Sequence, residues 1–168
     1  SDMKVSFGGI DLRINSDSHG NLTFIAENGV TYTSTLNSNG WYTIDAKFSG
    51  LTGSTAQLVF EGQGQVDTLG AFIDDIKLVG IDNLSSAVVD QITTIFKSSF
   101  EVNLNTDDVT FVNSVDGWTK INCDYIEIRD ELIENGNATF IGKALDGTKY
   151  VELNTDDSNT YPDSSGIT

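Results

Sequence analysis

The chain has 168 residues, of which 38% are hydrophobic, which is enough for one domain with a substantial core. Nine Lys and Arg stand against 25 Asp and Glu, so the formal charge of −16 makes phosphate backbones and anionic membrane surfaces poor partners. The single Cys excludes an intrachain disulfide, and no apolar run is long enough to predict insertion into a membrane.

Short strands are predicted throughout the first half of the chain. Runs of β-branched and aromatic residues are broken by clusters of Ser, Asp, Asn and Gly, a pattern typical of strands joined by turns. The predicted strands cover residues 5–14, 22–26, 30–36, 41–48, 56–61 and 71–79.

The last of these runs carries Asp74 and Asp75 at its centre. Adjacent strand residues point to opposite faces, so at least one carboxylate is expected at the apolar face or its rim. Burying a carboxylate is costly without a cationic partner. Because basic residues are scarce, we expect a metal ion rather than a salt bridge. Ca²⁺ suits the many Asp and Asn oxygens of the loops.

Residues 82–96 follow a different pattern. Apolar residues at 84, 88, 92 and 95 or 96 have helical spacing, and Asp82 or Asn83 suits an N-cap. The pattern predicts one short amphipathic helix within a linker at 81–98. Strand signals then resume at 109–112, 118–121, 124–129, 138–142 and 149–153. The whole chain is therefore predicted to be all-β, an antiparallel β-sandwich with one short helix between two strand-rich halves.

Several strings within these halves resemble one family. They include Asp67–Ile76 (DTLGAFIDDI), Ser99–Glu101 (SFE), Gly117–Trp118 and Gly147–Asn154 (GTKYVELN). Together they resemble the jelly-roll modules of calcium-dependent RTX adhesins of Gram-negative bacteria. They are more distantly similar to carbohydrate-binding modules of families four and twenty-two. The resemblance implies a jelly roll, an extracellular location on the bacterial cell surface, a non-catalytic role and neighbouring adhesin modules as partners.

The resemblance also implies a calcium site. In such modules a Phe-Glu segment and an Asp-Asp strand share a structural Ca²⁺. Carried over to this chain, Glu101 and Asp75 are the first expected ligands. Asp74 and Asn103 come next, and backbone carbonyls complete the six to eight oxygens that Ca²⁺ prefers.

The order of the halves departs from the family. Residues 4–80 resemble the closing half of a module and precede residues 99–168, which resemble the opening half. We expect one composite domain over 1–168. Two alternatives stay open, namely pieces of consecutive or split modules, and halves that complete each other in a swapped homo-oligomer. A large separation of Asp75 from Glu101 within one chain would favour the swap.

Aromatic and planar polar side chains are the candidates for binding a sugar, because rings stack on sugar C–H faces and polar groups pair with hydroxyls. The candidates are Tyr161, Asp156, Asp157, Asp163 and Trp118, with Trp41, Tyr42 and Tyr125 as further aromatic residues. The three Asp residues are also candidates for a second Ca²⁺.

The expected function is binding of a glycan or another surface ligand by a calcium-stabilised adhesin module. The alternative is a structural extender or split-domain scaffold without a ligand, and a more distant one is a glycoside hydrolase. No nucleophilic triad is predicted, because the single histidine, His19, lies in a turn and has no supporting motif.

Overall fold

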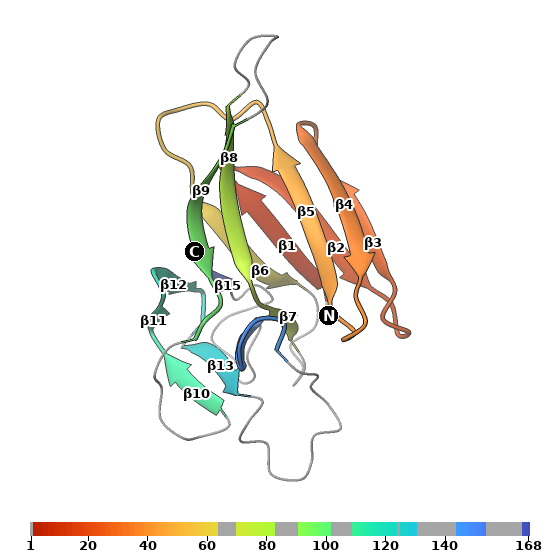
Figure 1. Cartoon of the computed structure of the whole chain (residues 1–168), viewed down its shortest axis with the longest axis vertical. Helices are drawn as coiled ribbons and strands as arrows, with labels where there is room; N and C mark the ends of the chain where they lie inside the picture. Colours follow the sequence, from red (N-terminus) through yellow and green to blue (C-terminus); the bar gives the residue numbers. More distant parts are fainter. Residues whose placement is uncertain are drawn as a thin grey trace.

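The computed structural model describes residues 2–63, 70–82, 91–101, 109–123, 125–130, 144–153 and 166–168. This part of the chain is all-β, and every strand pair in it is antiparallel (Figure 1). The strands are β1 (Asp2–Phe7), β2 (Ile10–Ser16), β3 (Leu22–Ala26), β4 (Val30–Leu36), β5 (Tyr42–Phe48), β6 (Leu58–Gln63), β7 (Ala71–Ile73), β8 (Ile76–Asp82), β9 (Gln91–Ser98), β10 (Val109–Val112), β11 (Ser114–Val115), β12 (Trp118–Ile121), β13 (Ile126–Asp130), β14 (Lys149–Leu153) and β15 (Gly166–Ile167).

Both halves of the chain contribute strands to the same sheets. The largest sheet has the order β11-β12-β15-β6-β1-β2-β3, and β15 joins β12 of the second half to β6 of the first. A second sheet, β10-β13-β14-β7, joins β14 to β7 in the same way. The hairpins β4-β5 and β8-β9 lie in front of the largest sheet (Figure 1), which gives the layered arrangement expected of a sandwich.

Two predicted strands are each divided by a turn. The strand predicted over 5–14 is wrong, because Gly8 and Gly9 have φ of 59° and 82° and form the two-residue turn between β1 and β2. The strand predicted over 71–79 is also divided. β7 ends at Ile73 and β8 begins at Ile76, and Asp75 between them has φ of 45°.

The predicted helix is not seen in the described residues. Residues 91–96 belong to β9, which pairs with β8 from Asp82↔Gln91 to Ile76↔Ser98. The run from Ile92 to Phe96 is rich in β-branched and aromatic residues, and its pairing with β8 overrides the helical spacing. Residues 83–90, which carry the rest of that prediction, lie outside the described part, as does the strand predicted over 138–142.

Other strand predictions are confirmed. The structure reproduces the limits predicted for 22–26, 30–36, 109–112, 118–121 and 149–153 without change. Those at 41–48, 56–61 and 124–129 are shifted by one or two residues.

The apolar side chains form two clusters. The first, which we call the lower cluster, contains ten buried residues, among them Phe100, Trp118 and Val151, and the Trp118 ring packs edge-on against Phe60 and Phe96. The second, the upper cluster, contains four buried residues, Val5, Leu12, Ile14 and Val30. The side chains around the upper cluster are largely half-buried.

Candidate functional site

The break between β7 and β8 places Asp74 beside the loop that precedes β14. Its carboxylate accepts hydrogen bonds from the backbone N–H groups of Leu145 (2.7 Å), Asp146 (3.0 Å) and Asp75 (2.7 Å). Burial raises the pKa of Asp74 to about 6, against the opposing effect of these three donors. The carboxylate is therefore partly desolvated but well supplied with hydrogen bonds.

Glu101 holds the same loop from the other side. Its Oε1 accepts the backbone N–H groups of Thr148 (2.7 Å) and Lys149 (2.6 Å), and its Oε2 accepts the Thr148 hydroxyl (3.3 Å). Gly147 lies between the two sets of contacts with φ of 72°, and a Cβ there would collide with the Glu101 side chain. Residues 144–149 are thus held by one carboxylate from each half of the chain, and we call this arrangement the acidic node.

Lys97 supplies a cation to the node. Its ammonium lies 3.1 Å from Oδ2 of Asp146 and 3.6 Å from Oδ1 of Asp75. The hydrogen bond to Asp146 raises the pKa of this exposed lysine. Asp75 therefore pairs with a lysine, and Asp74 accepts backbone N–H groups. A metal ion was the expected partner of these two carboxylates, and in the structure groups of the protein contact both of them.

Whether Ca²⁺ fits the node depends on which oxygens remain open. Oδ2 of Asp74 and Oε1 of Glu101 each accept two N–H groups. Oδ1 of Asp74 accepts one N–H group, and Oε2 of Glu101 accepts one hydroxyl. Both carboxylates can therefore offer one more lone pair, and the exposed Asp75 follows Asp74 directly in sequence. Within the described ranges, however, no three His, Cys, Asp or Glu side chains gather closely enough to hold a metal. Asn103, the fourth predicted ligand, lies outside these ranges.

The residues predicted to bind a sugar do not all lie in the described part of the chain, and those that do differ in exposure. Trp118 is 4% exposed and belongs to the lower cluster, so other side chains cover its ring in this structure, and its contact with a ligand stays a prediction. Trp41 is half-buried and packs edge-on against Tyr150 at 5.9 Å. Tyr161, Asp156, Asp157 and Asp163 lie outside the described residues.

Phe111 and Tyr125 form an exposed aromatic pair, of which the sequence predicted one member. Phe111 on β10 is 57% exposed, Tyr125 before β13 is 50% exposed, and their ring centroids are 5.9 Å apart. The Lys120 ammonium lies 5.6 Å from the centroid of the Tyr125 ring. Tyr125 was among the sequence candidates, whereas Phe111 was not, because its run VTFV does not reveal which face is covered.

Glu127, Arg129 and Glu152 form a buried charge network that was not predicted from the sequence. Glu127 on β13 and Glu152 on β14 are directly opposite in the ladder, and Nη2 of Arg129 lies 2.5 Å from Oε1 of Glu127 and 2.7 Å from Oε2 of Glu152. The Glu152 carboxylate also accepts the backbone N–H of Gly70 (2.8 Å). Burial lowers the pKa of Arg129, but the two carboxylates outweigh it and hold the pKa above its ordinary value. The network joins β13, β14 and the start of β7.

His19 lies in an exposed turn. The Asp17 carboxylate accepts backbone N–H groups from His19 (2.8 Å) and Asn21 (2.9 Å), and the side-chain amide of Asn21 lowers the pKa of Asp17. Asp17 therefore caps the turn and does not orient the imidazole.

Comparison of the chain with protein-family models, curated proteins and solved structures finds no match. The part of the chain that the structure describes contains no helix with the length and apolarity of a membrane span.

Proposed function

We propose that the chain is a non-catalytic jelly-roll module of a large bacterial surface adhesin, stabilised by Ca²⁺ outside the cell. The observation that carries this proposal is the acidic node. Asp74 and Glu101 come from the two halves that the family resemblance pairs, and both bind the same loop in one chain. This contact supports one composite module over a swapped assembly.

The node would hold Ca²⁺ through oxygens that hydrogen bonding leaves open. Asp74 and Glu101 each have one oxygen with a single hydrogen bond, and Asp75 contacts Lys97 only at 3.6 Å. A bound Ca²⁺ would add two positive charges to an acidic surface. Asn103 and backbone carbonyls remain the proposed sources of the other ligands.

A thermal melt in Ca²⁺ and in EDTA tests the metal. The clean variant is Asp75→Asn, because Asn tolerates positive φ and Asp75 holds no backbone amide of the loop. The matched control is Asp45→Asn, an exposed acid on β5. At a Ca²⁺ concentration about 100-fold above Kd, the wild type and the control should gain about 2.7 kcal/mol, and Asp75→Asn should lose most of that gain. A melting temperature that EDTA leaves unchanged would refute the calcium site.

For the ligand we propose a glycan bound at the aromatic pair Phe111 and Tyr125. Exposed rings offer faces for sugar C–H groups, and Lys120 beside Tyr125 offers donors for hydroxyls. A glycan array at millimolar Ca²⁺ should give hits that Phe111→Ala abolishes. The control Ile25→Ala removes an equally exposed apolar side chain from β3 and should keep them. An array without hits would count against a glycan.

The structural extender remains the second candidate, and the burial of Trp118 favours it. An extender needs rigidity and no exposed platform, so it predicts that Ca²⁺ raises the melting temperature while Phe111→Ala changes nothing. Hydrogen exchange at the amides of residues 145–149 with and without Ca²⁺ measures the stiffening directly.

A further inference from the structure

A cleft of about 360 Å³ separates the two front hairpins. Its walls are β5 and β8, its floor is formed by β1, β2 and β6, and its lower end lies at Asp74, Asp75 and Leu145. Figure 1 shows β5 and β8 side by side in the front layer, with the largest sheet behind them.

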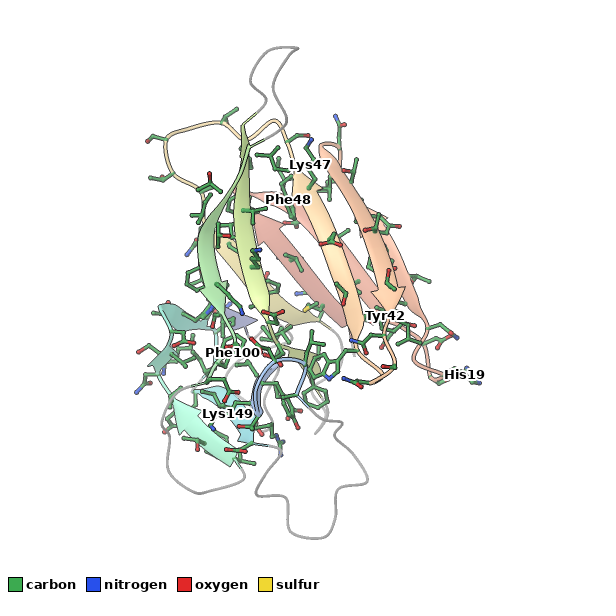
Figure 2. All side chains as sticks on the ribbon, in the orientation of Figure 1. His19, Tyr42, Lys47, Phe48, Phe100 and Lys149 are labelled. Carbon is green, nitrogen blue, oxygen red and sulfur yellow. The ribbon has the colours of Figure 1, made fainter. Side chains whose placement is uncertain are left out.

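Both walls are sheet edges. In the described part of the chain β5 pairs with β4 and β8 pairs with β9, and no ladder joins β5 to β8. The two strands run in the same direction. Figure 2 shows β5 rising from Tyr42 to Phe48, and β8 rises from the end near Phe100. One strand running the opposite way would therefore pair antiparallel with both, which is the pairing of all the strands that the structure describes.

The cleft lining is apolar and incompletely covered. Met3, Leu58 and Phe60 on the floor and Ile44 and Leu78 on the walls are all half-buried, although they line the interior of a layered fold. Covering apolar surface removes it from water and so favours association. A strand with apolar residues at alternate positions would direct them to this floor and leave its other side chains in solvent.

Charge identifies the kind of strand. The charged residues that line the cleft are Asp45, Asp74, Asp75 and Lys77, three acids and one base, in a chain with a formal charge of −16. An acidic segment is repelled, and a second copy of this chain would bring the same negative charge. A segment carrying Lys or Arg beside its apolar residues is complementary.

We propose that the cleft between β5 and β8 accepts an extended cationic strand from another protein by β-strand addition, antiparallel to both walls. Main-chain hydrogen bonds to two edges provide affinity, and the apolar floor with its acidic end provides selectivity for alternating apolar and basic residues. This inference goes beyond the proposed adhesin function. Because Asp74 and Asp75 are also the proposed Ca²⁺ ligands, its measurements are made in EDTA, and they need no glycan.

Titration calorimetry of the full chain with capped seven-residue peptides tests the proposal, because β5 and β8 have seven residues each. The probe is KVTVKVT. The controls are KTVVVKT, which has the same composition without alternation, and EVTVEVT, which reverses the charge. The probe should bind at least tenfold more tightly than either control.

Two variants locate the binding. Ala46→Trp places a large ring in the cleft at an exposed wall position and should weaken binding at least tenfold. Ser34→Trp makes a comparable exposed change on β4, outside the cleft lining, and should leave binding unchanged. Hydrogen exchange of β5 and β8 amides should slow when the probe binds.

Three outcomes would overturn the proposal. The first is equal binding of the alternating and block peptides, and the second is unchanged affinity in Ala46→Trp. The third is absence of probe binding. This result overturns the proposal if the wild type is monomeric, and equally if the wild type self-associates through a surface that Ala46→Trp disrupts.

Discussion

The lower and upper clusters belong to one layered fold but are covered to different extents. In the lower cluster Phe100 and Val151 are 0% exposed, and strands from both halves of the chain surround Trp118. In the upper cluster Leu12 is also 0% exposed, yet most of its apolar neighbours remain half-buried because the front layer consists of two separate hairpins. The core is thus closed where the halves meet and incomplete where only the first half faces the β8-β9 hairpin.

Truncation of a core side chain should show the difference in packing between the two clusters most clearly. Trp118→Ala removes a buried ring that packs against Phe60 and Phe96, and should cost about 3–5 kcal/mol of unfolding free energy. Ile44→Ala beside the cleft should cost about 1 kcal/mol, because its surroundings are partly solvated. Urea denaturation measures both. Equal losses would mean that the upper cluster is as tightly packed as the lower one.

The buried charge network belongs to the closed side and should show the next largest effect. Arg129→Leu leaves Glu127 and Glu152 buried without their shared cation and should cost about 3 kcal/mol. Lys97→Met removes an exposed lysine from the acidic node and should cost far less than Arg129→Leu, because solvent screens its ion pairs. Denaturant midpoints of the two variants should differ accordingly. A mild Arg129→Leu would indicate that water reaches this network.

Asp74 lies where the two regions meet, since it lines the cleft and also holds the 144–149 loop. Asp74→Ala leaves the N–H groups of Leu145 and Asp146 without their acceptor and should cost about 2 kcal/mol. Hydrogen exchange at these two amides should accelerate, whereas exchange at Leu12 should change only with global stability. Unchanged exchange at Leu145 would contradict the role assigned to the carboxylate.

A modest effect is expected for the pH dependence of Asp74. Its pKa is raised from 3.8 to about 6, so between these values the folded chain binds a proton that the unfolded chain has released. The contribution of Asp74 to stability should therefore be largest below pH 4 and decline as pH rises to 6. Screening by solvent at this half-buried group reduces the effect to about 1 kcal/mol. Unfolding curves from pH 4 to pH 7 should show a shallower decline in Asp74→Asn, and identical slopes would argue against the raised pKa.

Local patterns predicted strands well where their limits depend on nearby residues. The runs at 118–121 and 149–153 are bounded by turn residues in sequence, and their limits were predicted without error. The Gly8-Gly9 turn could also have been predicted, since two glycines between apolar runs are a turn signal. The single strand predicted over 5–14 overlooked this signal. The helix predicted over residues 82–96 does not form at residues 91–96, because its apolar spacing suits both periodicities and pairing with β8 decides between them.

The site could be predicted only in part. The association of the Asp74 segment with Glu101 followed from the family resemblance, and both residues do bind one loop. The donors that they meet are backbone amides in residues 145–149. Every residue except proline has such an N–H group, so the sequence carries no signal for it. The Glu127–Glu152 pair depends on the β13-β14 register, which also has no local signature.

The short strand β15 has a consequence for how the protein is made. Ile167 pairs with Lys120 on one side and with Phe60 on the other, so two residues join strands that are distant in sequence. During synthesis, the sheet that contains β6 and β12 cannot close until residues 166–167 have left the ribosome. The sheet therefore closes with the slow kinetics of non-local β pairing, and until residues 166–167 are available β6 and β12 present open edges that chaperones can bind.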